Sequence, residues 1–223
     1  MKNVIDFKKE YPYIGSLCGK ITLPSDYKEG ERLPLILFLH GAGEVGDGTF
    51  DTLEKVRVHG IPKYFTANPD YNGIRAITAS PQCIDGYIWD QLTLFLKDWV
   101  DTVAEKYNAD KSRISVTGIS MGGFGTWNMI TTYPDYFYRA APVCGGGVSW
   151  RINEGMKNLE LRVFHSTDDG SVPYECSVLM VQRAVQAGIK TLFTSYTDKG
   201  HGCWSSAYEE SDLISWLAGE DLK

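Results

Sequence analysis

The segment Gly118-Ile119-Ser120-Met121-Gly122 places glycines two positions to either side of a serine. An apolar run over Ile114–Thr117 precedes it and indicates a strand, and a helical pattern follows at once. In so tight a turn from strand to helix, only small residues fit two positions from the serine, and the turn exposes the hydroxyl. The pattern predicts Ser120 as a nucleophile at a helix amino terminus, where free amides favour negative charge.

A serine hydroxyl is a weak nucleophile at neutral pH and needs a base that a third group orients. With this type of turn the partners follow along the chain in the order serine, acid, histidine. Two histidines follow Ser120: His165, at the end of an apolar run, and His201, in a loop after the last predicted strand. Only His201 leaves room for an acid before it. We therefore predict His201 as the base and His165 as a structural residue.

The acid is expected directly after the apolar run that ends at His165, where Asp168 and Asp169 are adjacent. One of the two would orient the imidazole of His201. The other would be a turn residue or accept hydrogen bonds at a helix start, as aspartate commonly does before Gly or Pro. Residue chemistry alone leaves both aspartates as candidates.

Backbone amides that could stabilise an oxyanion are expected in two places. One is Met121, directly after the nucleophile, and the other is Ala42, within His40-Gly41-Ala42-Gly43 after the first central strand. Both amides would face the negative charge that develops on a substrate carbonyl oxygen. Gly41 and Gly43 are alternatives to Ala42, and the glycines also suit a sharp loop. Glu44 is expected to be an exposed loop acid.

These residues need a scaffold that brings distant loops to one edge, and the chain alternates apolar runs with helical patterns. The predicted strands are Leu35–Leu39, Ala76–Ala79, Ile114–Thr117, Ala140–Val143, Leu161–His165 and Leu192–Tyr196, and the predicted helices are Thr52–His59, Gln91–Tyr107, Phe124–Thr132, Tyr174–Ala187 and Ala207–Leu217. This alternation predicts an α/β fold with a mostly parallel central sheet and helices on both faces. Tyr13–Leu23 indicates an added antiparallel edge strand or hairpin.

Length and composition predict one folded domain over residues 1–223, because 43% hydrophobic and 22% charged residues are ordinary globular values. A net charge of −6 without a basic cluster argues against a nucleic-acid partner. The longest aliphatic and aromatic run, Leu35–Leu39, is too short to cross a membrane. The first residues do not resemble a secretory signal, and five cysteines without C-x-x-C spacing favour reduced thiols in a cytoplasmic protein.

Taken together, the motifs resemble those of compact esterases of the α/β-hydrolase superfamily, the phospholipase/carboxylesterase and dienelactone-hydrolase-like relatives of prolyl oligopeptidase. The matching pieces are His40-Gly41-Ala42-Gly43-Glu44, Ser80-Pro81-Gln82-Cys83 with Trp89, Gly118 to Gly123, Asp169-Gly170-Ser171-Val172-Pro173, and Gly200-His201 with Trp204. They extend over nearly the whole chain. The resemblance implies an α/β-hydrolase fold, and its pattern D-x-x-V-P selects Asp169 as the acid.

The same resemblance implies that Trp89 and Trp204 border the substrate pocket. Two positions depart from the family pattern: Ser166 replaces a usual Gly after the strand histidine, and Ile84 replaces a Pro found in many relatives. Neither belongs to the expected triad. The departures therefore concern the walls of the pocket and leave the catalytic assignment unchanged.

The resemblance implies a serine carboxylesterase that forms an acyl-enzyme on a small-molecule ester, by analogy an acylated carbohydrate. We expect no cofactor, and no metal because the histidines lack zinc-site spacing.

Only Cys144–Asn158 separates two strands where large caps are commonly inserted, so we expect no large cap. An open pocket near Trp150 should follow, with short-chain or aromatic acyl esters as substrates. The alternatives are a small serine peptidase of the prolyl oligopeptidase type and a non-catalytic binding module. The residues do not specify an oligomeric state.

Overall fold

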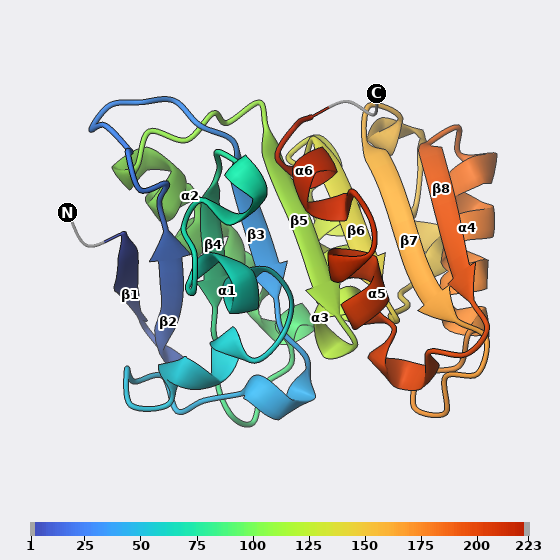
Figure 1. Cartoon of the computed structure of the whole chain (residues 1–223). Coiled ribbons are helices and arrows are strands. Elements are labelled where there is room, and N and C mark those ends of the chain that lie inside the picture. The colour runs from blue at the N-terminus through green and yellow to red at the C-terminus, as the bar shows by residue number, and fades with distance from the viewer. Residues whose placement is uncertain (1–2, 221–223) are drawn as a thin grey trace.

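A computed structural model describes residues 3–220 and places all eight of their strands in one sheet, in the order β1-β2-β4-β3-β5-β6-β7-β8 (Figure 1). The strands are β1 (Val4–Tyr11), β2 (Gly15–Thr22), β3 (Leu35–Leu39), β4 (Ile77–Pro81), β5 (Ile114–Ile119), β6 (Arg139–Val143), β7 (Glu160–Ser166) and β8 (Lys190–Tyr196). Pairing is parallel from β4 through β3 to β8, whereas β2 is antiparallel to both β1 and β4. The predicted mostly parallel sheet is confirmed.

Helices cover both faces of the sheet, as Figure 1 shows. One face carries α2 (Thr93–Lys106), α3 (Met121–Thr132) and α4 (Glu175–Gln186), and the other carries α1 (Gly60–Phe65), α5 (Trp204–Glu209) and α6 (Leu213–Leu217). Short 3-10 helices lie in the loops: η1 (Ala42–Glu44), η2 (Leu53–Arg57), η3 (Tyr71–Gly73), η4 (Trp89–Leu92), η5 (Ser149–Arg151), η6 (Glu154–Met156) and η7 (Gly200–Gly202). The loops at the carboxyl ends of the parallel strands meet along one edge.

Strand β3 shows why an uninterrupted apolar run predicts a central strand. All five of its residues are buried, and successive side chains point to opposite faces of the sheet. Leu37 packs into the core under α2 and α3, whereas Phe38 packs into the core under α1 and α5. Two separate hydrophobic cores therefore lie on opposite sides of the sheet.

The predicted strands all overlap observed ones, but the last predicted helix, Ala207–Leu217, is wrong as a single element. It breaks into α5 and α6 at Ser211, whose hydroxyl donates to the carbonyl of Ala207 at 2.6 Å and accepts from the amide of Leu213 at 3.1 Å. Serine competes in this way with the backbone of a helix. The predicted helix Thr52–His59 is the shorter 3-10 helix η2.

The predicted antiparallel segment at Tyr13–Leu23 corresponds to β2, and its partner at the edge of the sheet is β1, which was not predicted. Strand β1 mixes apolar and charged residues and is nowhere fully buried, so it lacks the continuous apolar run of a central strand. Phe7 fixes its position by packing edge-on against Trp99, with ring centroids 5.4 Å apart.

None of the helices in residues 3–220 is both long and apolar enough to cross a membrane. All five cysteines are free thiols, and four of them are buried. The cytoplasmic location expected from these cysteines stays a prediction.

Candidate active site

Ser120 lies between the end of β5 and the start of α3, in a backbone conformation that non-glycine residues rarely adopt. Its φ is 52° and its ψ is −117°. Two backbone hydrogen bonds hold it there: its amide donates to the carbonyl of Val143 at 3.0 Å, and its carbonyl accepts from the amide of Phe124 at 3.0 Å. Strain of this kind persists only where the surrounding structure enforces it, and it is common at functional sites.

The two glycines of the motif are required by close backbone contacts. A Cβ on Gly122 would lie 1.9 Å from the carbonyl oxygen of Leu39, and a Cβ on Gly118 would lie 2.4 Å from the carbonyl oxygen of Gly122. Both clashes are with backbone, which cannot rotate away as a side chain can. The motif is therefore needed for the chain to turn from β5 into α3.

We expect Gly122→Ala to lower the free energy of unfolding by roughly 4 kcal/mol, because the added methyl group would force β3 and α3 apart. The matched control is Gly43→Ala, since a Cβ on Gly43 would meet no atom within 4 Å. Urea unfolding of both variants measures the difference. Equal stability of the two variants would contradict the steric explanation.

Ser120, His201 and Asp169 form a continuous hydrogen-bonded chain across three loops. His201 Nε2 lies 2.9 Å from Ser120 Oγ, and His201 Nδ1 lies 2.8 Å from Asp169 Oδ2. The side chain of Asp169 is fully buried, whereas that of His201 is 25% exposed. The structure thus brings together the three residues expected as nucleophile, base and acid.

Asp169 is held as a carboxylate despite its burial. Burial alone would raise its pKa, but hydrogen bonds from His201 and from the amides of Val172 and Ser171 keep the pKa of Asp169 below its usual value. A carboxylate can only accept, so Nδ1 of His201 carries the hydrogen and Nε2 faces Ser120 with its lone pair. The imidazole is therefore in the tautomer that can accept the serine proton.

The buried His165 contacts the same carboxylate, at 3.1 Å from Nε2 to Asp169 Oδ2. Its Nδ1 lies 2.7 Å from the hydroxyl of Ser177, which donates to the carbonyl of Gly145. His165, which was predicted to be a structural residue, thus also contacts the carboxylate of the acid.

Asp168, the other candidate acid, does not contact the imidazole of His201. Its Oδ1 accepts a hydrogen bond from the hydroxyl of Ser166 and another, at 3.0 Å, from the amide of Gly200. These hydrogen bonds, the one from Ser166 first, lower the pKa of Asp168. The amide of Lys199 also donates to Ser166 Oγ, at 3.2 Å. Asp168 and Ser166 therefore hold in place the turn that carries His201. Sequence reasoning missed these hydrogen bonds because the partners lie far apart along the chain.

The amides expected to stabilise an oxyanion begin two helices, Met121 at the start of α3 and Ala42 at the start of η1. First-turn amides have no acceptor within their own helix. The η1 loop is held by His40: its Nε2 accepts from the amide of Cys83 at 2.9 Å, and its Nδ1 donates to the carbonyl of Gly41 at 2.6 Å. Burial lowers the pKa of His40 to about 4, so the ring stays neutral, as this pattern requires.

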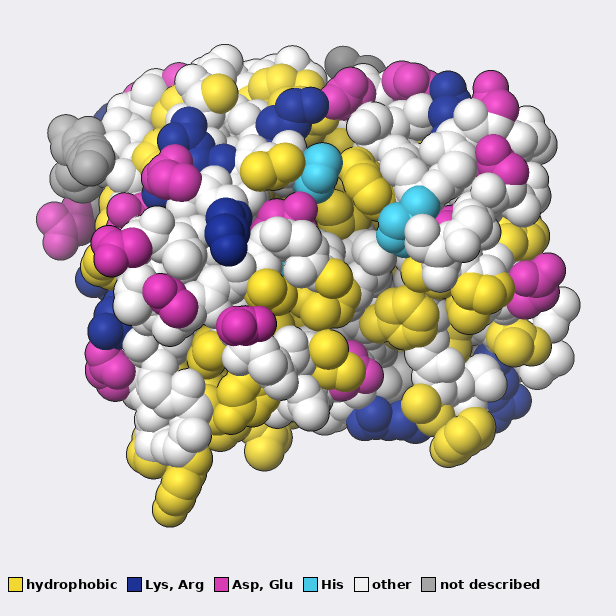
Figure 2. Space-filling model, turned by 90° about the horizontal axis from the view of Figure 1, so that it is seen from below, with side chains coloured by type: hydrophobic (Ala, Val, Ile, Leu, Met, Phe, Trp, Pro, Cys, Tyr) yellow, Lys and Arg dark blue, Asp and Glu magenta, His cyan; other side chains and the backbone are white. Residues whose placement is uncertain are grey.

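A cavity of about 320 Å³ opens beside Met121, lined also by Ile88, Asp90 and Phe124. Figure 2 views the molecule from the edge where the parallel strands end, and there hydrophobic and histidine side chains gather around a hollowed surface. No inserted domain covers this edge: the connection from β6 to β7 contains only η5 and η6. The predicted absence of a large cap is confirmed for the described residues.

Comparisons with known proteins identify the family of the chain and its fold. The Esterase family model matches residues 16–156. The chain belongs to this esterase family. A solved structure of a thermostable esterase is 30% identical, with a TM-score of 0.80, and the alignment covers 96% of this chain and 62% of that one. The feruloyl esterase module from Clostridium thermocellum is 14% identical, with a TM-score of 0.72, and the alignment covers 100% of this chain and 91% of that one, which shows a shared fold.

Among curated proteins, poly(3-hydroxyalkanoate) depolymerase C of Paucimonas lemoignei is 29% identical over 119 residues, which cover 51% of this chain and 28% of that protein. The chain thus spans less than a third of that relative and less than two thirds of the thermostable esterase. The α/β-hydrolase fold and the relation to esterases that the motifs implied are confirmed.

The prediction that Trp89 borders the pocket is wrong. Trp89 is only 1% exposed, because its indole lies beneath the η1 loop and donates to the carbonyl of His40 at 2.9 Å. Trp204 instead lies at the site, half-buried, with its ring 5.3 Å from that of His201 and 5.2 Å from that of His59. Trp150, also expected near the pocket, is 80% exposed.

Trp89→Phe is expected to lower the free energy of unfolding by about 1–3 kcal/mol more than Trp127→Phe does. The first variant leaves the buried carbonyl of His40 without its donor, which costs about this much. The second removes an equally buried indole whose nitrogen has no hydrogen-bond partner among the described residues. Thermal unfolding of both variants checks the prediction, and equal losses would contradict it.

Glu44 was expected to be an exposed loop acid, and this is also wrong. It is only 7% exposed, and its Oε2 has no hydrogen-bond partner in the described part of the chain. His59 Nε2 lies 3.7 Å from Oε1, and His40 Nδ1 lies 3.8 Å from Oε2. Burial raises the pKa of Glu44. The η1 helix folds this side chain inward, a placement that the sequence Gly-Glu does not indicate.

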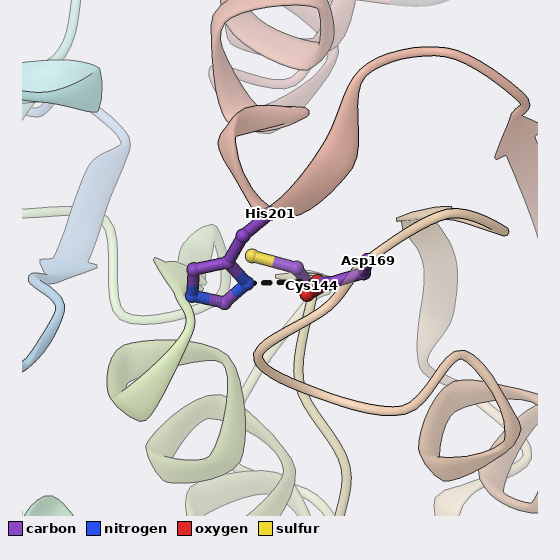
Figure 3. A group of neighbouring side chains, drawn as sticks. All are labelled: Cys144, Asp169 and His201. Atoms are coloured by element: carbon purple, nitrogen blue, oxygen red, sulfur yellow. Dashed lines mark hydrogen bonds and ion pairs between the residues drawn. The ribbon is translucent and has the colours of Figure 1, made fainter.

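Cys144 lies against the Asp169–His201 pair (Figure 3). One ligand atom from each of the three residues lies within 4.8 Å of the others, so the group could hold a metal ion. However, Asp169 and His201 already share a hydrogen bond, and burial raises the pKa of the Cys144 thiol well above its usual value, whereas metals bind the thiolate. We therefore assign Asp169 and His201 in this cluster to the hydrogen bond between them rather than to a metal ion.

Proposed function

We propose that this chain is a serine carboxylic ester hydrolase that works through an acyl-enzyme. The observation that carries the proposal is the hydrogen-bonded chain from Ser120 through His201 to the buried Asp169. A hydroxyl at a strained turn, a base within 2.9 Å and an ionised acid behind the base are the parts that nucleophilic acyl transfer requires. Membership of the esterase family supports an ester as the substrate.

In the proposed first half-reaction, Ser120 Oγ attacks the ester carbonyl carbon while its proton moves to His201 Nε2. The carbonyl π electrons move onto oxygen, where the amides of Met121 and Ala42 stabilise the negative charge. Asp169 stabilises the imidazolium without taking its proton. Collapse of the intermediate breaks the bond to the alcohol, whose oxygen takes the proton from His201.

In the second half-reaction, water attacks the acyl group on Ser120 and gives its proton to His201 Nε2. Collapse of this second intermediate returns the proton to Ser120 Oγ and releases the carboxylic acid. His201 accepts and returns a proton in each half-reaction, so the enzyme returns to its starting state.

Labelling with a fluorophosphonate tests the proposal directly, because the probe reacts with an activated serine. We expect stoichiometric labelling at Ser120, located by peptide mass spectrometry, together with hydrolysis of p-nitrophenyl acetate. An unlabelled, folded protein would support the non-catalytic alternative.

Matched ester and amide substrates distinguish an esterase from a peptidase. We expect kcat/KM to favour the ester, and turnover of the amide at a similar rate would contradict an esterase.

Small-molecule esters are the proposed substrates, with acylated carbohydrates as a candidate class. The open edge of the sheet supports this, because a carbohydrate carrying an acyl group needs room on the alcohol side. The solved feruloyl esterase module shares the fold. Hydrolysis of acetylated and feruloylated oligosaccharides, compared with hydrolysis of the corresponding methyl esters, tests the candidate class.

We expect kcat/KM for p-nitrophenyl esters to be highest at acetate or butyrate and to fall for octanoate and palmitate. The connection from β6 to β7 carries no lid, and the cavity beside Met121 has a volume of only about 320 Å³. Rates should not rise when the longer substrates form an emulsion. A maximum at octanoate or beyond, or a jump in rate at the oil–water interface, would instead indicate a lipase.

A further inference from the structure

His165, which the proposed reaction does not use, is fully buried beside the triad acid. It lies one residue before the end of β7, and its ring contacts polar atoms of the loop that follows β7 and of α4. A buried imidazole has two nitrogens, and each of them needs a hydrogen-bond partner. The nature of each partner therefore shows whether that nitrogen carries a hydrogen.

The first nitrogen, Nε2 of His165, faces two acceptors. It lies 3.1 Å from Asp169 Oδ2 and 3.1 Å from the backbone carbonyl oxygen of Val172. Neither an ionised carboxylate nor a carbonyl can donate a hydrogen bond. A lone pair on Nε2 would thus point at the lone pairs of both oxygens. Nε2 therefore carries a hydrogen.

The second nitrogen, Nδ1, faces the hydroxyl of Ser177, which has a single hydrogen. Ser177 Oγ lies 2.7 Å from His165 Nδ1 and 2.7 Å from the carbonyl oxygen of Gly145. The carbonyl can only accept, so it takes the hydroxyl hydrogen, and the hydroxyl oxygen is left to accept from Nδ1. Without a hydrogen on Nδ1, one of these two short contacts would join lone pairs. Nδ1 therefore carries a hydrogen as well.

Two ring hydrogens make His165 an imidazolium, and the buried carboxylate of Asp169 balances its charge. This carboxylate is saturated with donors: Oδ2 accepts from the rings of His201 and His165, and Oδ1 accepts from the amides of Ser171 and Val172. A buried ion pair is tolerated where hydrogen bonds satisfy its remaining polar atoms. Here every polar atom of both side chains has such a partner.

We propose that His165 is an imidazolium at neutral pH and a positioning residue of the triad, because it shares Asp169 Oδ2 with His201 and so limits the attraction of this carboxylate for a proton on His201. The proposal rests on the proposed ester hydrolysis and adds a second histidine to its proton transfers. When His201 takes the proton of Ser120, the two positive rings repel each other across Asp169. His201 then gives its proton to the leaving oxygen more readily.

The other titratable groups near His165 leave this assignment unchanged. The ring of Tyr174 packs edge-on against it, with ring centroids 5.7 Å apart, but the Tyr174 hydroxyl bonds another side chain. Burial raises the pKa of the Cys144 thiol well above its usual value, so Cys144 brings no charge. The carboxylate of Asp168 bonds other residues. Among the described residues, Asp169 is the charged partner of His165.

Nitrogen NMR of the whole chain, labelled with isotopic histidine, measures the protonation state directly. At about pH 8, where an ordinary imidazole is neutral, we expect one histidine with a hydrogen on both ring nitrogens. Its signals should be lost in His165→Gln and kept in His59→Gln. Ser177→Ala keeps the ring but removes the acceptor for Nδ1, so it should shift the same signals. A neutral His165 at this pH would overturn the proposal and leave the proposed hydrolysis intact.

His165→Gln also tests the effect on proton transfer, because its amide can still donate to Asp169 but carries no charge. Without the second charge, His201 holds a proton up to higher pH. The acidic limb of the kcat/KM profile for p-nitrophenyl acetate should therefore move upward by about one pH unit. The control is Tyr174→Phe, which keeps the ring against His165 and should keep the wild-type limb. Circular dichroism confirms that both variants are folded.

Three outcomes of the rate measurements would contradict the proposal. An unchanged limb in folded His165→Gln would show that the charge of His165 does not act on His201. A limb displaced to lower pH would give the interaction the opposite sign. Failure of the wild type to hydrolyse any ester would overturn both proposals, because the limb is a property of that reaction.

Discussion

Ser120→Ala is expected to lower kcat for ester hydrolysis about a million-fold while leaving the fold intact. The Ser120 hydroxyl makes its hydrogen bond to His201 Nε2, whereas the backbone hydrogen bonds of the turn are made by the Ser120 amide and carbonyl and persist in the variant. Loss of a triad nucleophile has an effect of this size in serine hydrolases, because the base and acid act only through it. Hydrolysis of p-nitrophenyl acetate, with fluorophosphonate labelling in parallel, measures the loss.

Ser206→Ala is a suitable control, since Ser206 is buried in α5 and its side chain has no assigned role in the site. This variant should keep wild-type turnover. More than about a tenth of wild-type activity in purified, folded Ser120→Ala would show that another residue is the nucleophile.

Asp169→Asn is expected to lower kcat by about ten-thousandfold. An asparagine amide can donate to Nδ1 of His201, which would then place the hydrogen on Nε2, the atom that must accept the proton of Ser120. The substituted side chain would also keep an oxygen for the amides of Ser171 and Val172, so the turn should survive. Initial rates with p-nitrophenyl acetate, together with a thermal melt, separate lost catalysis from lost folding.

The matched control is Asp168→Asn. It keeps one oxygen that can accept from Ser166 and Gly200, so we expect less than about a tenfold loss. If Asp168→Asn proved the more damaging of the two, the acid would be Asp168. Small losses in both variants would mean that another carboxylate orients His201.

The central part of this fold was predictable because its signals are local. β3 is a run of five apolar residues, and only a strand buried on both faces needs such a run. The turn at Ser120 was equally predictable from the sequence. A Cβ on Gly118 or Gly122 would clash with backbone atoms, so residues with a side chain do not fit at those positions. Edge strand β1 was missed for the converse reason: solvent accepts charged residues on its outer face, so no pattern marks it.

Side-chain direction at the site was the part that could not be predicted. Trp89 and Trp204 are both tryptophans next to site loops, yet one lies under η1 and the other beside His201. Their placement depends on distant partners, the carbonyl of His40 and the ring of His59. The inward orientation of Glu44 likewise depends on how η1 folds, and no local spacing in the sequence specifies it.

The position of Ser120 between two separate hydrophobic cores has a consequence for how this protein can change over evolutionary time. Substitutions under α2 and α3, around Met121 and Phe124, would alter the surface on one side of Ser120 without displacing His201 on the other. Substitutions near Trp204 would alter the surface on the opposite side without reshaping the cavity beside Met121. Selection can therefore adjust the two sides of the site one at a time, and related proteins should vary on these two sides independently.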